Sequence, residues 1–450
     1  MARGTTARSR CRPEPTERPT VDAATATSVE RELLRAFSPA VMDELRARTG
    51  YNPRQRVITA LRLTLTVVEA FLVGQTLSFA SLRAIFARRF QAVWSCPFQL
   101  RFKQPEAAEF FREALRHLVS SVVASAGIEL GGALAKFVDV RLIDGTGQRV
   151  PPRGRKKLPA CTKGRAGTKW VMGYSIKTGL LEEGICGAET SAEIPLWRQL
   201  VPSLTRGVLY VLDLGFFERQ LFTDAVEAGA HVLMRLKSNV KVRVTGHLHD
   251  RAFVELPDWT LGYYLKWASS ARGTLFDLDV IWGAGNAAVA LRLVGFAHKA
   301  NKIRWYLTTV PRHQLSARQI VEAYRLRWLI ELLFRELKQA PDFGRSFTAN
   351  PDAVKALTYG AMIAHVLVRS LRIHTALASE VPLEQLRPLA CLHVARAFAR
   401  EIVDALASAS HAVWARATAL VGGAIIRIAR ERKPSRSRRR IALSLGAVGG

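Results

Sequence analysis

Three carboxylates in this chain stand where they could act together on one substrate. Asp144 follows an apolar run, Asp213 follows another, and Glu331 lies in a stretch of helix-favouring residues. Acidic side chains that are brought together cannot all stay ionised without cations between them. Their hard oxygen atoms select Mg²⁺ or Mn²⁺, and two such ions about 4 Å apart can clamp the attacking and leaving oxygens of a phosphodiester. The residue types therefore point to metal-dependent phosphoryl transfer with two ions per site.

The segment that carries Glu331 predicts one helix of about four turns, because it contains no Gly or Pro between Tyr324 and Lys338. At about 100° per residue, its polar side chains share a sector about 60° wide, namely Tyr324, Arg327, Glu331 and Lys338. Leucine and isoleucine side chains form an apolar stripe behind them. One rigid element would thus hold a carboxylate between two cations and a phenol. The alternative is a solvent-exposed face on which Arg327 and Glu331 form an i,i+4 ion pair.

The two aspartates need strands to position them. Residues 136–143 alternate and then become apolar, which predicts a strand that stops at the turn-like sequence Asp144-Gly145-Thr146-Gly147. The apolar run 208–212 predicts a second strand that ends at Asp213. Open α/β sheets hold ligands at the carboxyl ends of their strands, so both acids would lie at that edge. Taken singly, each motif is more typical of an ordinary turn or helix start.

The order of the predicted elements indicates an α/β fold. Residues 131–239 predict three strands, a helix, a strand, a second helix and a fifth strand, which form a layered domain. Residues 240–310 read as a β-rich insertion, and residues 311–375 return to helices, beginning with a helix N-capped by Ser316. We therefore expect a mixed sheet flanked by helices, with a β-rich insertion and all-α regions at both ends of the chain.

The outer parts of the chain are predicted to be helical or disordered. Residues 1–27 read as a disordered basic arm, and residues 28–130 as a helical domain that either binds DNA or serves as a plain scaffold. Residues 376–450 read as further helices that end in a basic, phosphate-binding tail. The most apolar segments, 57–82 and 355–371, contain charged residues and are predicted to be buried helices rather than membrane spans.

The charge of the chain predicts a polyanionic partner. Lys and Arg number 66 against 37 Asp and Glu, which gives a net charge of +29, and nucleic acid is the usual partner of such a protein. Between Gly145 and Leu181 nine basic residues occur without an acidic one. A basic loop there would hold phosphates beside Asp144, although a solvated run of charges is the alternative.

The cysteines indicate a reducing compartment. Five of them lie far apart, and no C-x-x-C pair is present. This pattern argues against a disulfide framework and against a zinc cluster.

Three motifs together resemble those of a known family. The spacing Tyr324-x2-Arg327-x3-Glu331-x6-Lys338 is similar to the Y-R-E-K signature of bacterial cut-and-paste insertion-sequence transposases. Asp144-Gly145-Thr146 resembles the first-acid motif of that family, and Asp213-Leu214-Gly215-Phe216 resembles the second. The resemblance covers roughly residues 130–375 and includes the β-rich insertion before the third acid. It implies that residues 131–239 and 311–375 form an RNase H-like catalytic domain.

The resemblance also implies roles for individual residues. Asp144, Asp213 and Glu331 would bind two Mg²⁺ or Mn²⁺ ions and drive both hydrolysis and strand transfer. Phosphates near the transposon end would be contacted by three further residues of the signature, Tyr324, Arg327 and Lys338.

Two residues outside the signature have implied DNA contacts. Trp305 lies where the family carries a tryptophan that stacks on a base flipped out of the duplex. It could equally be an aromatic residue of a strand core. Lys237, just after the fifth predicted strand, would touch the same DNA.

We therefore expect a DNA transposase that cuts transposon ends and joins them to target DNA. The family implies a homodimer on paired double-stranded DNA ends, in the bacterial cytoplasm at the nucleoid and without a membrane partner. Two alternatives share parts of the pattern. An RNase H-like nuclease would cut without strand transfer, and an inactive derivative would only bind DNA, although the presence of all three acids argues against the latter.

Overall fold

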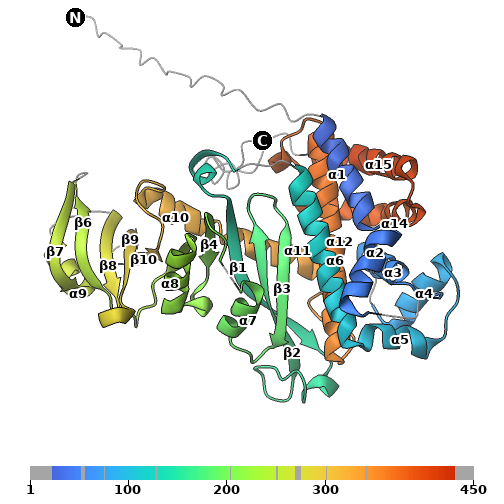
Figure 1. Ribbon diagram of the computed structural model, residues 1–450, viewed down its shortest axis with the longest axis horizontal. Coiled ribbons are helices and arrows are strands. Elements are labelled where there is room, and N and C mark those ends of the chain that lie inside the picture. The colour runs from blue at the N-terminus through green and yellow to red at the C-terminus, as the bar shows by residue number, and fades with distance from the viewer. Residues whose placement is uncertain are drawn as a thin grey trace, which may run out of the picture.

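The computed structural model consists of a helical part and a long sheet that lie side by side (Figure 1). It describes residues 23–51, 56–74, 77–126, 130–202, 204–249, 252–268, 275–299, 302–339 and 343–430. The predicted basic arm falls almost wholly outside these ranges, and so does the basic tail beyond residue 430.

The helices of the two chain ends share one hydrophobic core. α12 is buried along nearly its whole length and packs against α1, α3 and α6. Gly360 permits a close approach, because a Cβ at this position would overlap the side chain of Val67. The N-terminal helices are α1 (Ala23–Ala36), α2 (Pro39–Thr49), α3 (Ala60–Val73), α4 (Phe79–Arg89), α5 (Ser95–Lys103) and α6 (Pro105–Ala126). The C-terminal helices are α12 (Pro351–Ala378), α13 (Pro388–Ala397), α14 (Ala399–Ser408) and α15 (His411–Ala429).

Among the described residues, α15 is long and apolar enough to cross a membrane by length and composition. It packs against α12, α13 and α14 instead of standing apart, and 39% of its most apolar window is buried. A core helix can meet the same criterion, so this single helix is weak support for a membrane.

The described strands form one sheet of ten, in the order β3-β2-β1-β4-β5-β10-β9-β8-β6-β7. β1 pairs with β4, and β4 with β5, in parallel, and the remaining pairs are antiparallel. β10 joins β5 on one side and β9 on the other, so the β-rich insertion extends the sheet that carries the two aspartates. The strands are β1 (Asp139–Val150), β2 (Ala166–Ser175), β3 (Leu181–Ala188), β4 (Val208–Leu212), β5 (His231–Arg235), β6 (Arg243–His249), β7 (Ala252–Thr260), β8 (Leu275–Trp282), β9 (Val289–Lys299) and β10 (Lys302–Thr308).

Helices cover both faces of the parallel strands. All five residues of β4 are buried, and successive side chains point to opposite faces, so each face needs a covering layer. Leu209 and Val211 face the core shared with α12, whereas Tyr210 and Leu212 face the core formed with α7 (Glu193–Leu200) and α8 (Arg219–Ala228). α10 (Ala317–Arg325) and α11 (Trp328–Gln339) lie on the α12 side, and the short α9 (Leu261–Trp267) belongs to the insertion. The predicted mixed sheet flanked by helices is confirmed.

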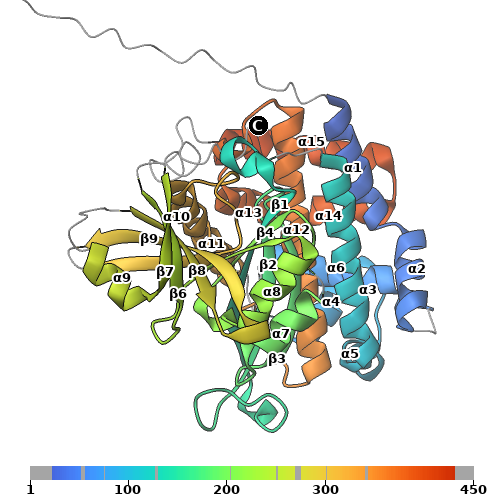
Figure 2. The ribbon, with the colours of Figure 1, turned by 60° about the vertical axis from the view of Figure 1, so that its left-hand side comes forward.

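The prediction that the first strand stops at Asp144 is wrong. β1 continues to Val150 because β2 pairs with it along its whole second half, as far as Val150 opposite Ala166. Asp144-Gly145 is therefore part of a strand and not a turn. The loop in the basic segment is shorter than predicted, because only residues 151–165 lie outside the sheet. It contains a 3-10 turn at Pro152–Gly154. This loop protrudes from the molecule (Figure 2).

Candidate active site

The parallel pairing of β1 with β4 brings Asp144 and Asp213 together. The register places Ile143 opposite Leu212, so the two aspartates are the next residues on neighbouring strands, whose axes lie about 4.8 Å apart. Asp144 stays in β1, where its Oδ1 accepts a hydrogen bond of 2.7 Å from the N–H of Gly145. Asp213 leaves the sheet and begins a 3-10 turn, η3 (Leu214–Phe216). Both predicted acids thus lie where the parallel pairing ends.

The segment predicted as a single helix is two helices. α10 ends at Arg325 and α11 begins at Trp328. Between them the backbone tightens, because Leu326 N bonds to Ala323 O at 3.1 Å and Arg327 N bonds to Tyr324 O at 3.2 Å. These are bonds three residues apart, as in a 3-10 helix, and they redirect the chain. Local propensity favours an unbroken helix, but the break lets Tyr324 pack on β10 while Arg327 turns towards β1.

Arg327 links the three predicted acids. Its Nη1 donates to Asp144 Oδ2 at 3.0 Å, and its Nη2 donates to Glu331 Oε1 at 2.5 Å. Its Nε lies 4.0 Å from Asp213 Oδ1. Glu331 stands in the first turn of α11, which packs against β1. The structure therefore brings together the three carboxylates that the sequence singled out, with a guanidinium among them.

The electrostatics of the site are those of crowded acids. Burial raises the pKa of Asp144 to about 6, the neighbouring acids Asp213 and Glu331 add to the rise, and the Gly145 N–H and Arg327 oppose it. Burial by itself would lower the pKa of Arg327, but the surrounding acids, Asp213 first, hold it above its usual range. Asp144 thus carries its charge at a cost that a further cation would offset.

An open pocket of about 630 Å³ contains this cluster. Lys338, about two turns beyond Glu331 on α11, lines the same pocket and is exposed. Three residues of the predicted polar stripe, Arg327, Glu331 and Lys338, thus line one pocket, although Arg327 lies in the break before α11 and not on the same helix. The complete lining is Asp144, Gly145, Thr146, Asp213, Arg327, Glu331, Phe334, Arg335 and Lys338.

The donor set fits a hard divalent cation in chemistry, since it offers carboxylate oxygens without sulfur or imidazole. Within the described residues, no three His, Cys, Asp or Glu side chains are grouped closely enough to hold a metal ion as they stand. Arg327 lies among the acids instead and neutralises part of their charge. The pKa of Asp144 stays raised even so, first because the carboxyl is buried and then because Asp213 and Glu331 are close.

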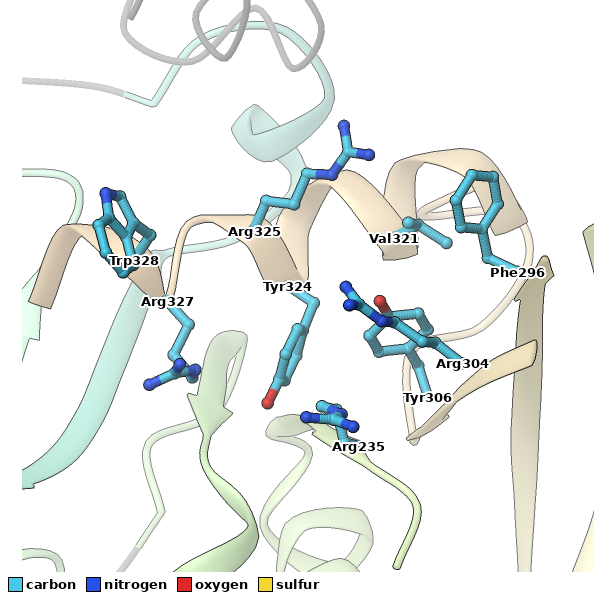
Figure 3. A pocket seen from close by; sticks show the side chains of 9 residues that line it. All are labelled: Arg235, Phe296, Arg304, Tyr306, Val321, Tyr324, Arg325, Arg327 and Trp328. Carbon is cyan, nitrogen blue, oxygen red and sulfur yellow. The ribbon is translucent and has the colours of Figure 1, made fainter. Parts of the chain in front are cut away.

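A second pocket, of about 470 Å³, lies beside the first and shares Arg327 with it (Figure 3). Tyr324 is buried, and its ring packs on Tyr306 of β10 with 5.0 Å between centroids. The Tyr324 hydroxyl points between Arg327 and Arg235 and makes no hydrogen bond within the described part of the chain. The complete lining is Arg235, Phe296, Arg304, Tyr306, Val321, Tyr324, Arg325, Arg327 and Trp328. Guanidinium groups and aromatic rings thus surround an unsatisfied buried hydroxyl.

Most residues of the second pocket could not be predicted from the sequence as part of a site. Arg235 ends β5, and Arg304 and Tyr306 alternate along β10, so their common location depends on the pairing of these strands. Trp328 follows Arg327 directly and is 48% exposed, which is unusual for a large aromatic side chain and becomes visible only in the structure.

Trp305 and Lys237, the two predicted residues outside the signature, are not part of the lining of either pocket. Trp305 points to the face of β10 opposite Tyr306, where it packs on Phe276 and covers Gly295. The Lys237 Nζ lies over the ring of Phe217, 5.6 Å from the ring centroid. Phe217 belongs to the segment that follows Asp213. The DNA contacts proposed for both residues stay predictions.

Comparison with known proteins assigns a family. The model of the transposase DDE domain matches residues 136–367. The transposase for insertion sequence element IS231B of Bacillus thuringiensis subsp. berliner is 20% identical over 381 residues, which is 74% of this chain and 77% of that relative. The IS231F transposase of Bacillus thuringiensis subsp. israelensis is 23% identical over 274 residues, so 53% of this chain is aligned with a little over half, 57%, of that relative.

A solved structure of a piggyBac transposase synaptic complex with hairpin DNA aligns with 95% of this chain and 85% of that chain. The TM-score of this alignment is 0.42, and the sequence identity is 13%. The family match stands independently of it, covers more than half of the 450 residues and includes all three acids. The chain therefore belongs to the transposase DDE domain family.

Proposed function

We propose that this chain is a metal-dependent DNA transposase that cleaves the ends of its element and transfers the freed 3′-hydroxyls to target DNA. The observation that carries the proposal is the meeting of Asp144, Asp213 and Glu331 around Arg327 inside the matched domain. One acid from strand β1, one from the residue that follows β4 and one from helix α11 converge there. Cleavage and transfer are the same in-line phosphoryl transfer repeated, so one site serves both.

The three carboxylates would hold two Mg²⁺ or Mn²⁺ ions. When bound, such ions stabilise the charge of the transition state and make a hydroxide or alkoxide nucleophile available at neutral pH. Arg327 would release the acids as cations replace it and would turn its planar fork to a phosphate, which it can contact in a bidentate way. Lys338, exposed in the same pocket, would act as a point charge on a neighbouring phosphate.

The second pocket would accept the DNA strand next to the scissile phosphate. The buried Tyr324 hydroxyl needs a hydrogen-bond partner, and a phosphate oxygen between Arg235 and Arg327 would supply an acceptor. Farther out, the loop 151–165 exposes basic side chains that fit a DNA backbone, namely Arg153, Arg155, Lys156, Lys157, Lys163 and Arg165. Homodimer formation on paired ends belongs to the same proposal, and light scattering with and without DNA tests it.

Strand transfer separates this proposal from a nuclease with the same acids. The test supplies purified protein with a pre-cut element end that carries a free 3′-hydroxyl, a supercoiled target plasmid and Mg²⁺ or Mn²⁺. We expect end–plasmid joints that disappear in EDTA. Cleavage of uncut ends without any joint product from pre-cut ends would contradict the transposase assignment in favour of a nuclease. An end blocked with a 3′-dideoxy nucleotide is the matched control and should give no joints.

A further inference from the structure

A fourth carboxylate, that of Glu193, lies against the two segments that carry Asp144 and Asp213. Gly145 follows the first aspartate, and a Cβ built on it would lie 3.1 Å from Glu193 Oε1. Gly215 comes two residues after the second, and a Cβ built there would overlap the same carboxylate, at 2.7 Å from its Cδ. The Glu193 carboxylate thus occupies the space left by two missing side chains.

The first turn of α7 fixes this carboxylate in place. Glu193 and Trp197 are four residues apart and share one face of the helix. Trp197 packs on Phe216 of η3, with 6.4 Å between ring centroids, so the same face is held against the turn that contains Gly215. From β2, Lys169 donates to the carbonyl of Ser191 at 2.9 Å and lies 3.8 Å from Glu193 Oε1. The start of α7 is therefore held by β2 and by η3.

Glu193 approaches the aspartates from the side opposite to Arg327. Leu142 packs in the core on the α12 side and Ile143 in the core on the α7 side. By the alternation of a strand, Asp144 points to the α12 side with Arg327, and Gly145 points to α7 and Glu193. The contact of Glu193 is therefore with the chain beside each aspartate and not with the aspartate carboxylates.

We propose that Glu193 is a positioning residue of the active site, which sets the separation of Asp144 and Asp213 by filling the gap between Gly145 and Gly215. This inference rests on the proposed function, because it concerns the two acids that would hold the cations. Ligands must be held within about 0.5 Å of their productive geometry. Residues that orient metal ligands typically change metal affinity by about 10-fold to 100-fold when they are removed.

The first test measures Mn²⁺ binding by the full chain without DNA, using titration calorimetry. Glu193→Ala should weaken the affinity by about 10-fold or more, whereas Glu193→Gln, which fills the same space, should remain close to wild type. Equal losses in both variants would overturn the positioning role, because they would show that the charge and not the volume matters. Wild-type affinity in Glu193→Ala would overturn it as well. Thermal unfolding of each variant, followed by circular dichroism, confirms that the compared proteins are folded.

Glu189 offers a matched control from the same connection between β3 and α7. Its carboxylate also lies against a glycine, since a Cβ on Gly167 would overlap it. Gly167 pairs with Arg149, which lies five residues beyond Asp144 on β1, so Glu189 contacts a part of the sheet that is not next to either aspartate. Glu189→Ala should leave Mn²⁺ affinity unchanged. A loss as large as that of Glu193→Ala would show that any carboxylate of this segment affects the site and would overturn the specific assignment.

A double-mutant comparison tests the contact itself. Gly215→Ala should weaken Mn²⁺ binding in the wild-type background, because the new methyl group displaces Glu193 or the turn after Asp213. In the Glu193→Ala background the same change should cost little more, since the space is already free. If Gly215→Ala reduces Mn²⁺ affinity by the same factor in both backgrounds, the two residues act independently and the contact is contradicted. If wild-type protein binds no Mn²⁺ and cleaves no DNA end, the proposed function itself fails, whereas a working wild type with a normal Glu193→Ala variant defeats only this inference.

Discussion

Arg327 Nη1 lies 3.0 Å from Asp144 Oδ2, although one residue belongs to the break between two helices and the other to a central strand. The same guanidinium donates to Glu331 and lines the pocket that contains Tyr324. One side chain thus connects the acids with the arginine-rich pocket. If cations bind at the acids and DNA binds in the second pocket, as proposed, Arg327 would exchange its carboxylate partners for a phosphate.

Replacement of Arg327 by Met should destabilise the metal-free protein most at high pH. Without the guanidinium, three ionised carboxylates repel one another, and we expect a loss on the order of 2 kcal/mol in the free energy of unfolding at pH 8. The loss should shrink at pH 5, where Asp144 is largely protonated because its pKa is about 6. Urea unfolding in EDTA at both pH values measures the difference. A loss of the same size at both would contradict the ion-pair account.

Asp144→Asn should have the opposite effect on stability. The pKa of Asp144 is raised by burial from 3.8 to about 6 in the folded chain, so the folded state resists its ionisation. The resulting cost is absent below the unfolded pKa, develops as the pH rises from about 4 to 6, and is fully present above that range. Metal-free Asp144→Asn should therefore exceed wild type by on the order of 2 kcal/mol at pH 8 and match it near pH 4. Lower stability than wild type at pH 8 would show that the pairing with Arg327 outweighs burial.

Arg369 anchors the helix that carries Glu331. It pairs with Glu336 of α11 at 2.5 Å, and the exposed fractions of the two side chains are only 8% and 17%. Arg369→Met would leave a largely buried carboxylate unpaired, so we expect a loss of about 3 kcal/mol in the free energy of unfolding. Arg369→Met combined with Glu336→Leu should recover much of it. Denaturant titration measures both variants, and a double variant no better than the single one would exclude the unpaired charge as the cause.

The second pocket should contribute to DNA affinity through its exposed arginines. Arg235→Ala and Arg304→Ala should each weaken binding of element ends and lower the slope of log affinity against log salt by about 1, because each removes one phosphate contact. Arg400, which is exposed on α14 and lines neither pocket, is the matched control. Fluorescence anisotropy across a salt series gives the slopes. Slopes that change as much for Arg400→Ala would attribute the effect to net charge alone.

The acids of the site could be predicted from the sequence because each has a local signal. Asp213 follows a short apolar strand, and Glu331 lies at a fixed spacing from Arg327. The register that places Ile143 opposite Leu212 makes the two aspartates neighbours, which agrees with the expectation that both follow strands at one edge of the sheet. Order and type of the elements could be inferred in the same way, since buried parallel strands and amphipathic helices have distinct patterns.

What the sequence did not show depends on tertiary contacts. The extension of β1 to Val150 comes from its pairing with β2. It could not be predicted because the glycines at 145 and 147 are typical of a turn. The break at Leu326 opposes local helix propensity and is explained by the packing of Tyr324 on Tyr306. Glu193 has no motif at all, because its relation to Gly215 arises only when α7 packs on η3.

Cleavage of an element end by Glu331→Gln, measured beside end binding, tests the central claim most directly. Gln keeps the size of the side chain and removes its charge, so the fold and the DNA contacts of Arg327 and Lys338 should survive. We predict no detectable nicking in Mg²⁺ and an affinity for the end within a few-fold of wild type, with an unchanged melting temperature. Nicking at the wild-type rate, or a parallel loss of binding and cleavage in a folded variant, would contradict the assignment of Glu331 to the active site.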